Sequence, residues 1–229
     1  LCRRSALAPY GMTPLRLEPA DGRTLRVLCL GAHSDDIEIG CGGTLLRWLA
    51  EYTRVEVTWV VFCAPGARAT EARHSARALT RRAASLDLVL GDWRDTQFPA
   101  DFAGAKAFTL GVRQRAPAPD VVLTHRLEDR HQDHRLVAEM TWQTWRDHLI
   151  LEYEIPKYEG DLGANNIYVP LPAALAARKV RHLLKHFGSQ HARDWFVEST
   201  FNGLMALRGV ECRAPSGMAE AFFARKTVL

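Results

Sequence analysis

A short segment near the start of the chain combines a histidine with three carboxylates. Gly31–Thr44 reads GAHSDDIEIGCGGT and carries His33, Asp35, Asp36 and Glu38. Adjacent carboxylates repel each other, and a bound divalent cation relieves that repulsion. One turn of backbone can aim His33 and Asp36 at a single ion, which leaves Asp35 to take a proton from a metal-bound water. This donor set suits zinc (Zn2+), with Fe2+ and Mn2+ as alternatives.

Two simpler interpretations of this segment stay open. Asp35 and Asp36 could cap the segment that follows while His33 packs in the core. The glycines of Gly40–Thr44 could cradle a phosphate, but GCGGT lacks the G-x-G-x-x-G spacing, and the nearby acids would repel a pyrophosphate. The missing spacing also disfavours an NAD-dependent oxidoreductase. We interpret the glycines as positions where the backbone packs closely beneath a site.

A second segment is equally rich in ionisable side chains. Thr124–Arg135 reads THRLEDRHQDHR, with His131 and His134 three residues apart and Asp133 between them. One histidine can complete a three-ligand zinc site that keeps an open position for water. Another histidine, oriented by a carboxylate, can donate a proton or stabilise an oxyanion. The spacing does not choose between the two histidines, and an exposed charged loop capped by Asp133 is the simpler alternative.

The surrounding pattern predicts alternating strands and helices. Apolar and β-branched runs predict strands at 24–31, 54–62, 86–90, 120–125, 149–155 and 166–169, with a final edge strand at 221–227. Helical patterns lie at 70–84, 103–115, 133–147, 173–187 and 193–207, and a glycine turn leads into a further helix within 40–52. We therefore expect an α/β fold, a Rossmann-like three-layer sandwich with a mostly parallel sheet. In such folds ligands bind beyond the carboxyl ends of the strands, where both polar segments would meet.

Composition narrows the class of protein. The chain has 229 residues, 47% of them hydrophobic and 24% charged, with a net charge of +4. These values are those of an ordinary globular domain and exclude a disordered chain or a disulfide miniprotein. We expect residues 1–19 to be an N-terminal tail of uncertain status and residues 20–229 to form one domain. The oligomeric state stays open, a homo-oligomer included.

Charge and cysteine usage indicate a protein of the cytoplasm that binds neither nucleic acid nor membrane. The densest basic run, 68–82, places its arginines at helical spacing, as on a solvated helix face; a groove for an anionic nucleotide-sugar is the alternative. No stretch of about 20 apolar residues is present, so we expect no membrane span. The five cysteines are widely spaced and form no CxxC pair, which fits a reducing cytoplasm.

Together the two segments resemble the PIG-L/LmbE-like family of metal-dependent N-acetylglucosaminyl de-N-acetylases. The family pattern AH-P-DD, GCGGTL and HPDH is matched by AHSDD at 32–36, GCGGTL at 40–45 and HQDH at 131–134. The resemblance runs from Arg26 to about Gln190, and FGSQ at 187–190 is similar to a late family motif. Ser34 and Gln132 replace the two prolines, and we expect these changes to loosen the backbone without removing a ligand.

The resemblance implies roles for the polar residues. It implies three zinc ligands: His33, Asp36 and His134. It implies that Asp35 is the general base and that His131, paired with Asp133, stabilises the tetrahedral intermediate or protonates the leaving amine.

Three residues are candidates for the group that helps to hold the oxyanion. Some family members carry a tyrosine where this chain has Asp129. Arg73, Tyr153 and Tyr158 are our candidates for substrate binding, because an arginine or a phenol can donate a hydrogen bond to an oxyanion. The segment 152–162 (EYEIPKYEGDL) fits a substrate loop and an ordinary connecting loop equally well.

Three functional hypotheses follow. The first is a zinc hydrolase that removes an N-acetyl group from a GlcNAc-type amino sugar, either free or linked to a nucleotide, a lipid or a natural product. The second is a metal-dependent amidase that acts on another small amide or a thiol conjugate. The third is a non-catalytic domain that binds a sugar or a nucleotide.

Overall fold

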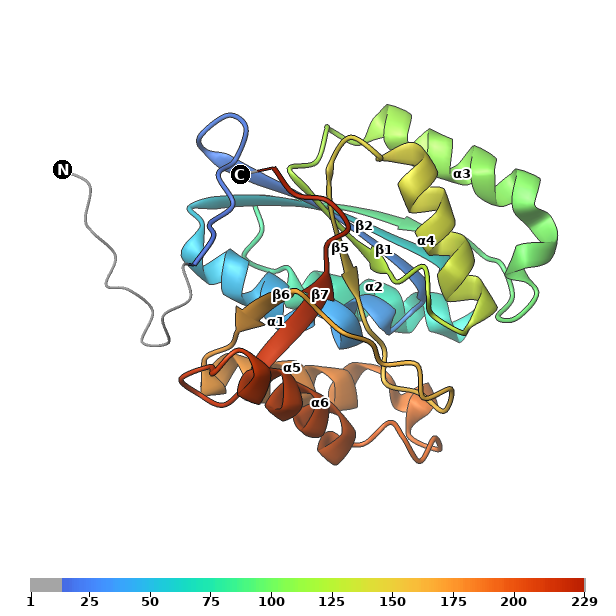
Figure 1. Ribbon diagram of the computed structural model, residues 1–229. Helices are drawn as coiled ribbons and strands as arrows, with labels where there is room; N and C mark the ends of the chain where they lie inside the picture. Colours follow the sequence, from blue (N-terminus) through green and yellow to red (C-terminus); the bar gives the residue numbers. More distant parts are fainter. Residues whose placement is uncertain (1–13, 229) are drawn as a thin grey trace.

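A seven-stranded sheet forms the centre of the molecule. The computed structural model describes residues 14–228, so the first part of the expected tail lies outside the described residues. The strand order is β3-β2-β1-β4-β5-β7-β6, and the first five of these strands run parallel (Figure 1). The strands are β1 (Thr24–His33), β2 (Arg54–Cys63), β3 (Ser85–Leu90), β4 (Val121–His125), β5 (Leu149–Tyr153), β6 (Ile167–Pro170) and β7 (Ala219–Phe223).

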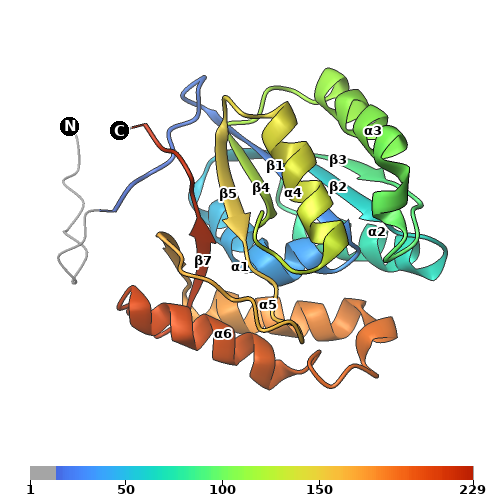
Figure 2. The same cartoon turned by 45° about the vertical axis from the view of Figure 1, so that its right-hand side comes forward.

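Helices cover both faces of this sheet, which confirms the expected three-layer α/β class. The helices are α1 (Asp36–Glu51), α2 (Ala67–Leu79), α3 (Phe102–Arg115), α4 (Gln132–Thr144), α5 (Ala173–His186) and α6 (Glu198–Glu211), with short 3-10 turns at Phe98–Asp101 and Gly188–Gln190. α3 and α4 lie on one face, and α1 and α2 lie on the other, with α5 and α6 outside them (Figures 1 and 2). Alternate residues of β1 supply the two cores: Val27 and Cys29 pack towards α1, Leu28 and Leu30 towards α4.

The order of the strands creates the crevice in which a site can lie. From β1 the chain continues outward through β2 and β3, and it then crosses to β4 on the other side of β1. The connections after β1 and β4 therefore leave in opposite directions, which opens a crevice at their carboxyl ends. β1 ends at His33 and β4 ends at His125, so both strands deliver histidines there.

The glycine segment differs from its prediction. We expected a glycine turn before the helix, but α1 begins at Asp36 and the glycines lie inside it. A Cβ on Gly40 would lie 2.2 Å from Cδ2 of Tyr153, and a Cβ on Gly43 would lie 2.4 Å from Cδ1 of Leu171. The glycines thus allow β5 and the β6–α5 connection to approach the helix backbone, as the close-packing interpretation predicted.

The last strand also differs from its prediction. β7 is not an edge strand, because it lies between β5 and β6 and pairs antiparallel with both. β6, only four residues long, forms the edge instead. Pattern alone showed that the segment was extended but not which neighbours it would have. Within residues 14–228, no helix is long and apolar enough to cross a membrane.

Candidate functional site

The two polar segments meet at the crevice between β1 and β4. His33 is the last residue of β1, and Asp36 is the first residue of α1. On the other side, His131 caps α4, and His134 lies in the first turn of that helix. Each side chain therefore stands at a carboxyl strand end or at the helix start that follows it, where parallel α/β folds place their ligands.

Three donor atoms form a small triangle. Nδ1 of His33 lies 3.2 Å from Nε2 of His134 and 3.3 Å from Oδ2 of Asp36, and the last two atoms are 3.5 Å apart. Tetrahedral zinc with bonds of about 2.0–2.1 Å would separate its ligand atoms by about 3.3–3.4 Å. Two imidazole nitrogens and one carboxylate oxygen at this spacing fit a zinc ion in both chemistry and size.

The charge states suit a cation. Burial opposes the charge of Asp36, but the histidines around it hold the pKa of this carboxyl well below its usual range. Burial and the nearby His125 lower the pKa of His134 to about 3, so its imidazole is neutral at pH 7. Burial opposes the charge of His33 as well, yet Asp36 and Asp133 raise its pKa well above the usual value. A bound metal would displace the proton that His33 carries.

Further carboxylates orient the two histidines. Oδ2 of Asp129 lies 2.9 Å from Nδ1 of His134 and 3.1 Å from Nζ of Lys157. Oδ2 of Asp133 lies 3.1 Å from Nε2 of His33. Carboxylates in such positions fix the ring orientation of metal-binding histidines. Asp129 thus stands where some relatives are expected to carry tyrosine, and it holds a histidine there.

Asp35 is held by an arginine that the sequence interpretation treated as part of a solvated face. Arg68 forms an ion pair with Oδ1 of Asp35, and its Nη1 donates to Glu71 at 2.8 Å and to Ser189 at 3.0 Å. Ser189 belongs to the FGSQ segment, so this late motif reaches Asp35 through Arg68. Burial raises the pKa of Asp35, while the charge of Arg68 opposes the rise.

The other arginines of that run are exposed, as expected: Arg73, Arg77, Arg81 and Arg82. The sequence analysis did not single out Arg68; the one local hint is Glu71, three residues on along the same helix face.

The two positions that replace prolines are tied down rather than loosened. The hydroxyl of Ser34 donates to the carbonyl oxygen of Arg68 at 3.0 Å. Nε2 of Gln132 donates to the carbonyl oxygen of Thr96 at 3.2 Å. Each side chain links its site segment to a neighbouring loop, which compensates for the rigidity of a proline ring.

His131 and Asp133 lie side by side but do not pair through their side chains. The backbone N–H of Asp133 donates to Nδ1 of His131 at 3.2 Å, while the Asp133 carboxylate faces His33. Nε2 of His131 instead lies 3.7 Å from Oδ1 of Asp95, an exposed carboxylate after β3. Thr96, the next residue, adopts a left-handed φ of 66° and donates its N–H to Asp133 at 2.8 Å. The sequence did not single out Asp95, although it follows a strand that ends at the same edge of the sheet.

His125 is another residue that the sequence interpretation missed. It is fully buried beneath the triangle, with its Nε2 3.1 Å from Oδ2 of Asp36. Its ring stacks on that of His134 at a centroid distance of 3.9 Å. The only available signal was a histidine at the end of an apolar strand.

The three candidate substrate residues are not gathered at the triangle. Tyr153 is fully buried below it, and its hydroxyl donates to the carbonyl oxygen of Leu30 at 2.6 Å. Tyr158 is 68% exposed and hydrogen-bonds Asp194. Arg73 is exposed on α2. Within the described part of the chain, neither Tyr158 nor Arg73 makes a hydrogen bond or ion pair with the histidines of the crevice.

Fold and site together define an α/β protein with a histidine–carboxylate centre in the crevice between β1 and β4. Residues 28–145, just over half of the chain, match the family described as GlcNAc-PI de-N-acetylase (PIG-L). The chain belongs to this family. A comparison with curated protein sequences finds no match.

Solved structures show the same fold at low sequence identity. N,N'-diacetylchitobiose deacetylase from Pyrococcus horikoshii is 20% identical with a TM-score of 0.66, over 87% of this chain and 83% of that one. The conserved protein TT1542 from Thermus thermophilus is 19% identical with a TM-score of 0.67, over 90% and 96%. The 4-carboxy-2-hydroxymuconate hydratase from Pseudomonas putida KT2440 is 16% identical with a TM-score of 0.69, over 90% and 98%.

Proposed function

We propose that this protein is a zinc-dependent hydrolase that removes the acetyl group from an N-acetylated amino sugar. The observation that carries the proposal is the triangle of His33, Asp36 and His134, with edges of 3.2–3.5 Å. Membership of the GlcNAc-PI de-N-acetylase family supports the reaction, and the likeness to a diacetylchitobiose deacetylase supports an amino-sugar substrate. Fe2+ and Mn2+ are alternative ions for the same donor set.

The residues of the first segment would activate the water. A zinc ion held by the triangle would lower the pKa of a bound water and polarise the amide carbonyl. Asp35 accepts the proton of the attacking water, and its raised pKa suits it to hold that proton. Arg68 keeps one carboxylate oxygen of Asp35 engaged, so the other oxygen is left for the proton.

The residues of the second segment would complete the reaction. Nδ1 of His131 accepts a backbone hydrogen bond, so a proton on this ring resides on Nε2. From Nε2, His131 donates a hydrogen bond to the developing oxyanion or a proton to the leaving amine. Asp133 acts through His33, whose ring it orients.

Two other reactions belong in the test. A small amide or a thiol conjugate would use the same water activation without a sugar. The hydratase from Pseudomonas putida has the highest TM-score of the three structures compared, so addition of water to a carbon–carbon double bond is the candidate from outside amide chemistry. A sugar- or nucleotide-binding domain without catalysis would need no metal.

Metal content is the first measurement. Purified protein would be loaded with zinc, freed of excess ion and compared with His134→Ala. We expect about one tightly held ion per chain, lost in the variant. A wild-type protein that retains no metal would refute the hydrolase and favour the binding domain.

A substrate panel is the second measurement. Acetate release would be assayed with N-acetylated amino sugars and with acetamides that lack a sugar, and release of the free amine would be assayed with thiol conjugates. An unsaturated hydroxy acid would test hydration. Turnover of the amino sugars alone supports the proposal. Faster turnover of the sugar-free amides would replace it with the amidase.

The place of action is a further proposal. We propose that the protein acts on small molecules in a reducing compartment, the cytoplasm being the expected one. Within residues 14–228, four cysteines are buried and free, which is how thiols persist in a reducing compartment.

A further inference from the structure

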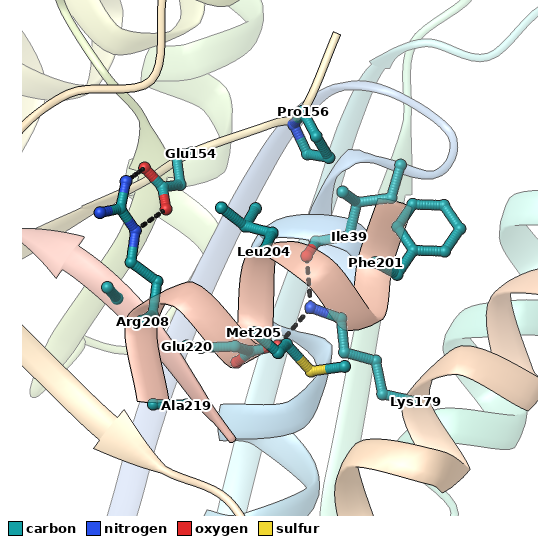
Figure 3. A pocket seen from close by; sticks show the side chains of 12 residues that line it. Ile39, Glu154, Pro156, Lys179, Phe201, Leu204, Met205, Arg208, Ala219 and Glu220 are labelled. Atoms are coloured by element: carbon teal, nitrogen blue, oxygen red, sulfur yellow. Dashed lines mark hydrogen bonds and ion pairs between the residues drawn. The ribbon is translucent and has the colours of Figure 1, made fainter. Parts of the chain in front are cut away.

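A buried ion pair from the C-terminal third of the chain contacts the backbone of α1. Nζ of Lys179 (α5) lies 2.6 Å from Oε1 of Glu220 (β7), and both side chains are at most 5% exposed. Figure 3 shows the pair beside the start of α1, in a cavity of about 10 Å³. A space of this size holds about one water molecule, so it is not a substrate site.

The pair makes hydrogen bonds to backbone groups inside α1. Nζ of Lys179 donates to the carbonyl oxygen of Ile39 at 2.5 Å. The two oxygens of Glu220 accept from the backbone N–H groups of Gly43 at 2.8 Å and of Thr44 at 2.6 Å. In a regular α-helix, the carbonyl of residue 39 accepts from the N–H of residue 43. A cation beside that carbonyl and an anion beside those N–H groups are the partners that helix ends prefer.

Glycine makes this arrangement possible. A Cβ on Gly43 would lie 2.9 Å from Oε1 of Glu220, too close for any other residue without movement. The carbonyl oxygen at the end of the first turn of α1, residues 36–39, therefore accepts from a lysine while the helix continues to Glu51. That turn begins with Asp36 and follows directly on Asp35.

A gain in stability does not by itself explain why this buried ion pair is present. Replacing a buried ion pair by apolar side chains is often neutral or stabilising, because both charges must be desolvated. A second pair lines the same cavity, where Arg208 binds both oxygens of Glu154 at 2.6 and 2.8 Å (Figure 3). The other hydrogen-bond partners of Arg208 are Glu211 and the carbonyl oxygen of Gly163, neither of which belongs to α1. The second pair thus resembles the first in burial and charge but makes no hydrogen bond to the helix that carries Asp36.

We propose that Lys179 and Glu220 are positioning residues for the metal centre. By fixing the carbonyl of Ile39, they hold the first turn of α1 so that the Asp36 carboxylate stays in the triangle and Asp35 stays beside Arg68. This inference rests on the proposed function, since it assumes that the triangle binds a metal.

The test compares two double variants that each remove one pair. Lys179→Met with Glu220→Gln leaves no lone buried charge, and Arg208→Met with Glu154→Gln is the matched control. Zinc affinity would be measured with zinc alone, against a chromophoric chelator, and unfolding would be followed in parallel. We expect the first variant to bind zinc about 10–100-fold more weakly, the usual effect of losing a group that supports a ligand. The control should bind zinc as tightly as the wild type, even if its Tm falls equally.

A second readout separates positioning from packing. With zinc at saturation, kcat for acetate release should fall in the first variant while KM changes little, because Asp35 is displaced. If the double variant does not fold, Lys179→Leu with Glu220→Gln, matched by Arg208→Leu with Glu154→Gln, carries the same test without leaving a lone buried charge.

The outcomes distinguish this inference from the proposed function. Equal zinc affinity in the wild type and in the Lys179/Glu220 variant would overturn the positioning role and leave the hydrolase intact. Equal losses of affinity in both double variants would show a general effect of packing and would also overturn it. A wild-type protein that binds no zinc would overturn both.

Discussion

Gly40→Ala tests the close approach beneath the site. In an exposed helix position, replacing glycine by alanine stabilises a protein by about 0.5–1 kcal/mol, because the unfolded chain loses freedom. At Gly40 the new methyl group would lie 2.2 Å from Cδ2 and 2.5 Å from Cγ of Tyr153. That ring is fully buried, and its hydroxyl is engaged with Leu30, so it has no room to retreat. Overpacking of this kind costs about 1–3 kcal/mol, which exceeds the gain. We therefore expect a net loss of stability.

Gly111→Ala is the matched control. Gly111 also lies inside a helix, α3, but a Cβ there would meet nothing within 4 Å. The free energy of unfolding of both variants would be measured by urea denaturation at pH 7. The control should be stabilised, and the difference between the two variants should be about 1–3 kcal/mol, the overpacking cost alone. Equal stability of the two variants would mean that the helix and β5 do not approach as described.

Three further predictions concern the site and its surroundings. Asp129→Asn should weaken zinc binding about 10–100-fold, because His134 loses the carboxylate that orients it; unchanged affinity in a chelator competition would contradict this. Arg68→Met should keep the metal content of the wild type but lower kcat for acetate release at least about tenfold, since Asp35 loses its partner; a loss of metal would contradict the assignment of Arg68 to Asp35. Burial lowers the pKa of His182 from 6.5 to about 3, so the unfolded state takes up this proton first as the pH falls below 6.5. Between pH 7 and pH 5, the free energy of unfolding should therefore drop by about 1–2 kcal/mol more in the wild type than in His182→Asn, as urea denaturation at both pH values would show.

The sequence predicted most of the sheet because buried strands are recognisable as apolar runs. β1 and β2 are continuous apolar runs that end in polar loops, and such runs with helices between them indicate a parallel sheet. The same logic brought the two histidine-containing segments to one edge of the sheet. The position of β7 was beyond this reasoning, because the five residues AEAFF do not reveal their neighbours, which include distant residues such as Tyr168.

The site was predictable where its residues form a local motif and not where they come from elsewhere. His33, Asp36 and His134 belong to two segments that are rich in ionisable side chains, and this richness identified them as candidates. Arg68 and Asp95 are single charged residues in ordinary surroundings. The role of Arg68 depends on Asp35, 33 residues earlier in the chain. The role of Asp95 depends on the loop in which Thr96 has a left-handed φ. A single sequence carries no trace of such contacts.

The ion pair at α1 also means that one contact beside the candidate site forms late in synthesis of the chain. Glu220 is 177 residues later in the chain than Gly43, and Lys179 is 140 residues later than Ile39. At a synthesis rate of about 5–20 residues per second, the segment that contains Asp36 is synthesised roughly ten to forty seconds before Glu220. During that interval the N–H groups of Gly43 and Thr44 have only water and the carbonyl oxygens of their own helix as partners. A ribosome stalled before residue 220 would thus carry a chain with all three triangle residues already translated but with the turn that aims one of them still unsupported.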